Sequence, residues 1–304
     1  MPMHAAIIVT YFPDQDALGN LERLCDLCDT VIVIDNTPRP EMERFPPRSN
    51  LTVWNCAANM GLASGLNTGM GLAAKQGIEN IFLFDQDSRP SSQYFQTMMK
   101  FKSKADNASP RYAFYVPNFY DRNSKTFATF PLIGRLSLRH VTCRDMPAMA
   151  DNSALIAITS GMLITLSVYN RIGPFREDYF IDFVDNEYCL RAGLLGYSIA
   201  VNCDLILDHA VGRRSVKRLL GLTIKPNHHA PVRRYYIFRN GIRTTLDYFR
   251  SYPLYAVLMT ARLSHEVLSI FLYEKNKCSK IKAMTFGIHH AFTGRMGRCP
   301  RTRL

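Results

Sequence analysis

Uncharged apolar runs alternate with helix-forming segments through the first 85 residues, and this alternation limits the possible folds more than any other feature. The runs are AAIIVT at 5–10, TVIVI at 30–34, LTVWN at 51–55 and NIFLF at 80–84. Residues 16–28 and 62–76 lie between them and have the apolar spacing of helices. Continuous apolar strands joined by helices predict an α/β fold with a mostly parallel central sheet, covered by helices on both faces.

The rest of the chain divides into a less regular middle part and a helical end. The middle part offers strands at 114–117, 155–158, 160–164, 199–201 and 205–207 and a helix at 186–195. Residues 235–249 and 254–273 have helical spacing. We therefore predict one α/β domain over 1–245 and a basic, amphipathic helical tail over 246–304. No uncharged apolar run reaches about 18 residues, so no membrane-spanning helix is predicted, and no secretory signal is evident.

Positive charge is concentrated in the last third of the chain. Residues 1–210 hold 18 Lys/Arg and 22 Asp/Glu, whereas residues 211–304 hold 19 Lys/Arg and 3 Asp/Glu, a net charge of +16. Such a segment attracts polyanions: nucleic acid, an anionic membrane surface or a phosphorylated ligand. The sequence spells out no known nucleic-acid-binding module, so we expect no nucleic-acid partner.

The eight cysteines are scattered along the chain. Cys25 and Cys28 form a CxxC pair, but no second pair follows at zinc-site spacing, and both lie within the predicted helix at 16–28. We therefore expect two ordinary thiols. The scattered pattern favours a reducing cytoplasm over a disulfide framework.

Polar side chains follow three of the predicted strands: Thr10-Tyr11, Asp35-Asn36 and Asp85-Gln86-Asp87. In open α/β sheets ligands bind beyond the carboxyl ends of the strands, so these groups mark the expected site. Asp85 and Asp87 could converge on one Mg²⁺ or Mn²⁺, for which hard oxygen ligands and substrate phosphates are suitable. The alternative is a turn with two solvated acids. Asp35 could accept a hydrogen bond from a pyrimidine base or could form an Asx-turn.

Small residues are dense over 59–69, at the predicted start of the helix 62–76. They would let a ligand approach a helix N-terminus closely, or let the helix pack closely on the sheet. We expect both uses, with Asn59 and Gly61 nearer the ligand and Gly65 and Gly69 in packing.

Two further segments carry chemistry. Residues 180–191 hold Asp182, Asp185 and Glu187 directly before and within a predicted helix, more acids than one helix cap needs, so one could be a general base. Residues 228–240 combine His, Arg and Tyr, which could bind phosphates or form a basic patch for RNA or a membrane.

These motifs, in this order, resemble glycosyltransferase family 2 with the GT-A fold, and more narrowly its bacterial rhamnosyltransferases. The resemblance covers about residues 5–245. It is carried by 9–11, 35–36, 59–69, 84–88, 160–161, 172–175, 180–191 and 228–240.

The resemblance implies a role for each candidate residue. Asp185 is the catalytic base, with Asp182 as the alternative because Val184 stands where many relatives have Glu. The metal would be Mg²⁺ or Mn²⁺, held by the DXD carboxylates Asp85 and Asp87 and by His209, which lies 24 positions after Asp185. Residues assigned to the donor are Thr10, Tyr11, Asp35, Asn59, Gly61, Asn67, Asp85 and Gln86. Residues assigned to the acceptor or the diphosphate are Gly161, Glu187, His228, Arg233, Tyr236 and Arg239.

The implied reaction is an inverting transfer of L-rhamnose from dTDP-L-rhamnose to a hydroxyl of a polyprenyl-diphosphate-linked glycan, as in O-antigen or capsule synthesis. The basic tail would then hold the enzyme as a peripheral protein on the anionic inner face of the bacterial plasma membrane. A UDP-hexose donor is the alternative within the family. A nucleotidyltransferase would need a Gly-rich basic loop after the first strand, where Tyr11-Phe12-Pro13-Asp14 stands instead.

Overall fold

The computed structural model describes residues 3–38, 44–107, 111–121, 126–133, 137–145, 154–209, 217–219, 222–224 and 226–300. The first half contains β1 (His4–Thr10), α1 (Gln15–Leu27), β2 (Thr30–Asp35), β3 (Leu51–Asn55), α2 (Leu62–Lys75), β4 (Asn80–Asp85) and α3 (Tyr94–Asp106). All of these except α3 were predicted from the apolar pattern, with ends that differ by a residue or two.

The middle part is strand-rich and irregular. It contains β5 (Tyr112–Asp121), β6 (Thr126–Phe127), β7 (Phe130–Ile133), β8 (Leu138–Val141), β9 (Ala154–Leu155), β10 (Met162–Thr165), α4 (Leu166–Ile172), the short 3₁₀ helix η2 (Glu177–Tyr179), α5 (Val184–Leu194), β11 (Ser198–His209), β12 (Lys217–Leu219) and β13 (Leu222–Ile224). The two short runs predicted at 199–201 and 205–207 are one strand, β11, which is interrupted by a register shift after Asn202.

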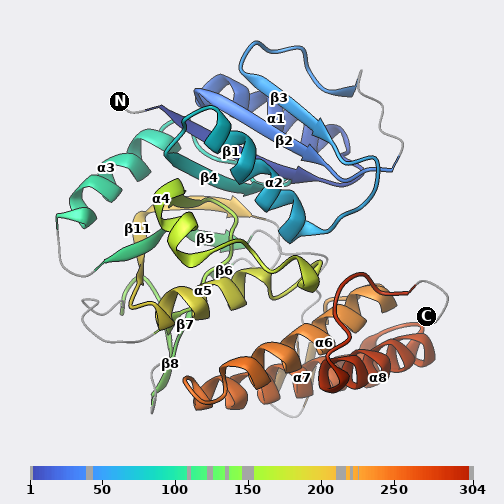
Figure 1. Cartoon of the computed structure of the whole chain (residues 1–304). Coiled ribbons are helices and arrows are strands. Elements are labelled where there is room, and N and C mark those ends of the chain that lie inside the picture. Colours follow the sequence, from blue (N-terminus) through green and yellow to red (C-terminus); the bar gives the residue numbers. More distant parts are fainter. Residues whose placement is uncertain are drawn as a thin grey trace.

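One eight-stranded sheet forms the centre of the molecule (Figure 1). Its order is β11-β5-β10-β4-β1-β2-β3, and β6 pairs with β5. Only β10 and β6 run antiparallel to their neighbours in it, so the predicted mostly parallel sheet is confirmed. The registers set Thr10 beside Asp35 and Val9 beside Asp85, so the carboxyl ends of β1, β2 and β4 meet at one edge.

Close packing of α2 on the sheet explains two glycines of the small-residue segment. A Cβ at Gly65 would lie 2.8 Å from a side-chain carbon of Val9, and one at Gly69 would lie 2.5 Å from the side chain of Ile7. The packing role predicted for Gly65 and Gly69 is therefore confirmed.

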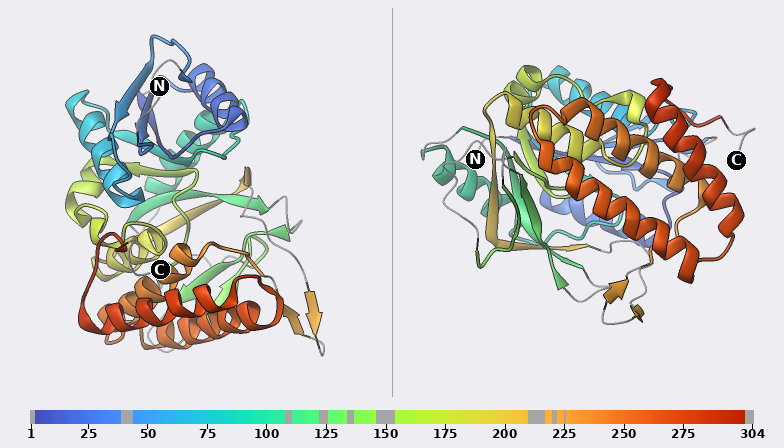
Figure 2. Two further views of the ribbon diagram at one scale, coloured as in Figure 1. Left: turned by 90° about the vertical axis from the view of Figure 1, so that its right-hand side faces the viewer. Right: turned by 90° about the horizontal axis from the view of Figure 1, so that it is seen from below.

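Three helices, α6 (Pro231–Tyr248), α7 (Pro253–Tyr273) and α8 (Lys277–Thr293), form a layer at the C-terminal end. They lie side by side beyond α5, at the bottom of Figure 1, and face the viewer in the right-hand view of Figure 2. Buried charges join them: Arg234 pairs with Glu266 and Glu274, and Glu274 also pairs with Lys280. The predicted domain boundary after residue 245 falls inside α6.

The helix α7 differs from the sequence expectation. It has 21 residues and a mean hydropathy of 1.2 in its most apolar window, so by length and composition it could cross a membrane, although no such helix was predicted. Its buried side chains include Glu266, which is paired with Arg234, and 28% of that window is buried within the protein. Its exposed side includes the apolar residues Val257, Leu268, Phe271 and Leu272.

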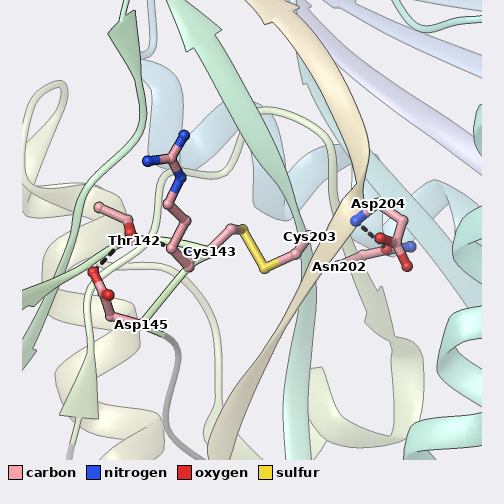
Figure 3. The surroundings of a disulfide bond; sticks show 7 residues. Thr142, Cys143, Asp145, Asn202, Cys203 and Asp204 are labelled. Atoms are coloured by element: carbon pink, nitrogen blue, oxygen red, sulfur yellow. Dashed lines mark hydrogen bonds between the residues drawn. A yellow bond between two sulfur atoms is a disulfide. The ribbon is translucent and has the colours of Figure 1, made fainter.

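Two of the cysteines form a disulfide, although the scattered pattern favoured a reducing cytoplasm over a disulfide framework. Cys143, just after β8, is bonded to Cys203 in the irregular part of β11 (Figure 3). Cys25 and Cys28 are buried free thiols, and burial raises their pKa values to about 11 and about 12. At neutral pH both are therefore protonated and poorly nucleophilic, as expected for ordinary core thiols.

Candidate active site

The carboxyl end of β2 carries Asp35, which is almost completely buried. Its Oδ1 atom accepts hydrogen bonds from the Thr10 hydroxyl (3.0 Å), the Thr37 backbone N–H (3.1 Å) and the Thr37 hydroxyl (2.7 Å). The bond from the N–H two residues on is an Asx-turn, the structural alternative considered for this residue. One carboxylate oxygen of Asp35 thus fixes the loop that follows β2. A contact of Asp35 with a nucleobase stays a prediction.

The loop after β1 is tied to the acidic motif through Gln86. The Tyr11 N–H donates to Gln86 Oε1 (2.9 Å), and the side-chain amide of Asn20 donates to the Gln86 carbonyl (3.3 Å). The Tyr11 side chain is 42% exposed and lies edge-on to the ring of Phe12. Gln86 therefore ties the loop that carries the partly exposed Tyr11 to the acidic motif.

The motif Asp85-Gln86-Asp87 ends β4 in a tight turn. The Ser88 N–H donates to the Asp85 carbonyl (3.1 Å), and the Asp85 N–H donates to the Ser88 hydroxyl (3.2 Å). Ser88 and Ser160 are fully buried, and their hydroxyls bond to each other at 2.6 Å. All three residues of the motif are partly exposed, so their side chains lie at the surface of the sheet edge while the turn beneath is fixed.

At the start of α2 the small residues meet the chain rather than an open surface. A Cβ at Gly61 would lie 2.5 Å from the Phe180 carbonyl oxygen, and the Leu62 N–H donates to that carbonyl (2.6 Å). Asn59 Oδ1 accepts from the Gly61 N–H (3.0 Å). Glycine is needed here because Gly61 has φ +89° and leaves no room for a side chain.

Asn67, predicted to bind the donor, is occupied by another part of the chain. Its amide nitrogen donates to the Phe175 carbonyl and to Glu177, and its amide oxygen accepts from the Phe175 N–H and the Tyr169 hydroxyl, all at 2.9–3.0 Å. Four bonds use the hydrogen-bonding capacity of a side-chain amide in full. In this structure Asn67 therefore anchors residues 169–177, and a contact of Asn67 with the donor stays a prediction.

The segment that precedes α5 has an unusual backbone. Phe180, Asp182 and Phe183 have φ values of +66°, +63° and +65°. Left-handed conformations of this kind cost about 1–3 kcal/mol per residue and persist only where the surroundings enforce them. We call residues 178–183 the base loop, because it leads directly into Asp185.

Asp185 lies in the first turn of α5 and is partly exposed. Burial raises its pKa to about 6, and the carboxylates of Asp85 and Asp182 add to the rise, whereas the Asn186 N–H (2.8 Å) and Arg262 lower it. Asp85 and Asp182 are therefore near enough to act electrostatically on Asp185, which places the acids from β4, the base loop and α5 in one neighbourhood. The structure therefore brings together the two acidic motifs that lie about a hundred positions apart.

Asp182 and Asp185 have different partners. Both carboxylate oxygens of Asp182 accept hydrogen bonds from Arg233 at 3.1–3.2 Å. Asp182 raises the pKa of Arg233, and Asp85 and Asp185 contribute to the rise. Within the described part of the chain Asp185 forms no ion pair of this kind. An acid with both oxygens held by a guanidinium is the poorer proton acceptor, so the geometry favours Asp185 as a base.

Arg262 is a residue of the site that the sequence interpretation missed. It lies on α7, its guanidinium stands 4.8 Å from the centre of the Phe183 ring, and its charge lowers the pKa of Asp185. In the sequence it only interrupts the apolar face of a helix. That interruption is a weak signal, because an exposed cation can also simply be hydrated.

The residues assigned to the acceptor or diphosphate separate into buried and exposed groups. The buried ones are Gly161, Glu187, Tyr236 and Arg239. The exposed ones are His228 and Arg233, whose side chain is 46% exposed.

The buried residues assigned to the acceptor or diphosphate make contacts within the protein. Glu187 pairs with Arg191 (2.9 Å) and accepts from the Tyr248 hydroxyl (2.7 Å). The ring of Tyr236 stacks on Phe180. Their burial is at odds with direct contact to a ligand in this conformation.

Gly161 forms the tight turn before β10 at φ +76°, where its N–H donates to the Leu83 carbonyl (2.7 Å). Arg239 donates to backbone carbonyls of the base loop, among them Asp178 (3.1 Å) and Tyr179 (3.0 Å). Both residues therefore also lie in the interior of the fold, and their contact with the acceptor or the diphosphate stays a prediction.

The metal prediction is not tested by the described side chains. Asp85 and Asp87 are oxygen donors at the cluster, and the backbone of Asp208 pairs with Arg89, so the end of β11 with His209 runs beside the acidic motif. The side chain of His209 lies outside the described residues. Among those that are described, no group of three or more His, Cys, Asp or Glu side chains is arranged to hold a metal.

Comparison with known proteins identifies one curated relative and several solved structures of similar fold. No protein-family profile matches the chain. The "dTDP-rhamnosyl transferase RfbF" of Shigella flexneri is 32% identical over 241 residues, which are 78% of this chain and 77% of that protein.

Solved structures share the fold. The crystal structure of S. aureus TarS 1-349 has a TM-score of 0.51 and 14% identity, covering 96% of this chain and 72% of that one. The same protein in complex with UDP-GlcNAc has a TM-score of 0.50 and 14% identity, covering 95% and 72%.

The fold is that of the GT-A glycosyltransferases, and this chain is a glycosyltransferase. More particularly, it belongs to the family of the Shigella rhamnosyltransferase, with which it shares sequence across most of both chains.

Proposed function

We propose that this glycosyltransferase transfers L-rhamnose from dTDP-L-rhamnose to a hydroxyl group, with inversion at the anomeric carbon, and that it is a family 2 enzyme. The observation that carries the proposal is the meeting of Asp85, Asp182 and Asp185 at the carboxyl edge of the sheet, with the pKa of Asp185 raised to about 6. The name of the Shigella relative supports the donor, and the UDP-GlcNAc complex of TarS supports a nucleotide sugar in general.

Asp185 is the proposed base. With a pKa of about 6 it is mostly ionised at neutral pH yet basic enough to take a proton from an attacking hydroxyl. The acceptor oxygen attacks the anomeric carbon as its proton passes to Asp185, and the bond to the nucleoside diphosphate breaks. Arg233 occupies the carboxylate oxygens of Asp182, which makes Asp182 a poorer proton acceptor, and its positive charge lies beside the acids.

The donor set at the edge fits a divalent metal of the Mg²⁺ or Mn²⁺ type. Asp85 and Asp87 offer carboxylate oxygens on one turn, and His209 would be the third ligand. When bound, such an ion supplies positive charge that stabilises a leaving diphosphate. The turn held by Ser88 keeps the backbone of the two acids in place.

We further propose that the acceptor is a polyprenyl-diphosphate-linked glycan and that the enzyme works at the cytoplasmic face of the plasma membrane. The exposed apolar side of α7 lies close in sequence to Lys275, Lys277 and Lys282, all exposed. Apolar side chains flanked by cations suit an anionic lipid surface. Retention of the intact protein in solution when mixed at low salt with vesicles rich in anionic lipid would contradict this attachment.

A donor screen tests the reaction. The purified protein is incubated with membrane extract, Mg²⁺ or Mn²⁺, and either dTDP-L-rhamnose or UDP-hexoses, and nucleotide release is measured. We expect release from dTDP-L-rhamnose. Activity with UDP-hexoses alone would contradict the rhamnosyl donor and leave the glycosyltransferase assignment standing.

A further inference from the structure

The base loop is held by two neighbouring residues of α6. The side-chain amide of Asn240 donates to the carbonyls of Tyr179 (2.9 Å), Ile181 (2.8 Å) and Asp182 (2.9 Å). Its amide oxygen accepts from Arg239 Nε (2.9 Å), which fixes which end of the amide faces the loop. One fully buried amide thus serves three carbonyls of a single strained segment.

Arg239 extends the same contact. Its guanidinium donates to the carbonyls of Asp178 and Tyr179 and also to that of Gly297 beyond α8. It lies over the rings of Tyr235 and Tyr236, and Tyr236 in turn stacks on Phe180. The guanidinium is therefore enclosed, with its donors directed at backbone rather than at solvent.

Close approach of α6 makes these bonds possible. Gly241 follows Asn240, and a Cβ there would lie 3.0 Å from the Phe183 ring. On its other side the loop meets α2, where the Leu62 N–H donates to the Phe180 carbonyl. The base loop is thus held between the N-terminus of α2 and the C-terminal layer.

The three residues of the base loop with positive φ need such contacts to keep their conformation. Phe180, Asp182 and Phe183 are not glycines, and a chain free to relax would leave these conformations. The carbonyls of Tyr179, Ile181 and Asp182 accept hydrogen bonds from Asn240. A change of φ at Phe180 or Asp182 would turn these carbonyls away from the amide. Asp185 follows Phe183 by two positions, so its carboxylate moves with the loop.

We propose that Asn240 is a positioning residue for transfer, which holds the base loop in its strained form so that Asp185 points at the acceptor hydroxyl. This inference rests on the proposed role of Asp185. Asn240 has no solvent exposure and does not touch the substrates; it acts through Asp182 and Asp185. Arg239 supports it by fixing the orientation of its amide.

The test compares Asn240→Ala with Thr244→Val. Thr244 lies one turn along α6, is equally buried, and bonds the Tyr179 hydroxyl (2.9 Å) and the Asn240 carbonyl (2.8 Å) without touching a carbonyl of the loop. The measurements on the full chain are the turnover number for nucleotide release from dTDP-L-rhamnose, the affinity for dTDP by calorimetry, and the melting temperature.

We expect Asn240→Ala to lower turnover by about 100-fold, because a misplaced reacting group costs this much, while dTDP affinity stays at the wild-type value. Thr244→Val should keep wild-type turnover even if its melting temperature falls as far. If Asn240→Ala does not fold, Asn240→Ser, which keeps one donor, is judged by the same criterion.

Wild-type turnover in a folded Asn240 variant would overturn the positioning role and leave the reaction standing. A parallel loss of turnover and dTDP affinity in both the Asn240 and Thr244 variants would also overturn it, since it would indicate general damage. A wild-type protein that releases nucleotide from no donor would instead contradict the proposed function itself.

Discussion

The carboxyl ends of β1, β2 and β4, where we propose that the donor binds and which we call the donor edge, are built differently from the base loop. At the donor edge, Thr10, Asp35 and Asp85 end strands that are neighbours in the sheet. Short turns fix Asp35 and Asp85, and the Thr10 hydroxyl bonds Asp35. At the base loop, Asp182 and Asp185 depend on Asn240, about 60 positions further along the chain, and on Arg233 and Arg262. The comparison teaches that the first half of the site follows from local pattern, whereas the second half is held by contacts with the C-terminal layer.

The largest effect should come from the base. Asp185→Asn removes the proton acceptor but keeps the shape of the side chain, so we expect turnover to fall by about 100- to 10,000-fold. Binding of dTDP should be unaffected, since the donor edge keeps all its contacts. Steady-state nucleotide release and calorimetric titration of dTDP measure the two. Joint loss of both would indicate that the two regions are not separable.

The buried ion network of the C-terminal layer should dominate stability. Arg234→Met leaves Glu266 and Glu274 buried without their shared partner, which should lower the free energy of unfolding by about 3–5 kcal/mol. The exposed Arg250 is the control, and Arg250→Met should change it by less than about 0.5 kcal/mol. Urea unfolding followed by circular dichroism measures both. Equal effects of the two substitutions would contradict the structural role of the network.

An intermediate effect is expected at Asn67, which separates anchoring from donor binding. Asn67→Ala removes four hydrogen bonds to residues 169–177, so stability should fall by about 1–3 kcal/mol. The affinity for dTDP should remain at the wild-type value. A variant with wild-type stability and weakened dTDP binding would restore the donor role predicted from the sequence.

The last effect concerns the pH dependence of stability. The pKa of Asp185 is about 6 in the folded protein against 3.8 for the ordinary group, so the folded state binds more protons between these values and the ionised carboxylate destabilises it at higher pH. Asp185→Asn should therefore be more stable than wild type at pH 7, and the difference should vanish below about pH 4, where the carboxyl is protonated in both states. Urea unfolding at a series of pH values measures the difference, and a variant less stable than wild type at pH 7 would contradict this sign.

The sequence predicted the first half of the molecule well for a physical reason. Strands buried on both faces are continuous apolar runs, and a polar residue that ends such a run stands at the ligand edge. The elements from β1 to β4 follow this rule, and the roles of the carboxylates at 85 and 185 stay predictions.

The predicted site residues in the interior have a common feature. Asn67, Glu187 and Arg239 have polar side chains suited to a ligand, and in this structure each is hydrogen-bonded to partners that are distant in sequence. No local pattern reveals such partners. The same holds for the Cys143–Cys203 disulfide, whose members are separated by 60 positions, and for Arg262.

The pH dependence of kcat/KM with dTDP-L-rhamnose, measured for the wild type, Asp182→Asn and Asp185→Asn, tests the central claim most directly. Because the base must be ionised, we predict that wild-type activity rises with pH through a midpoint near the pKa of Asp185, about 6. Asp182→Asn should keep this rise, and the residual activity of Asp185→Asn should lack it. A rise that persists in Asp185→Asn and disappears in Asp182→Asn would contradict the account and make Asp182 the base.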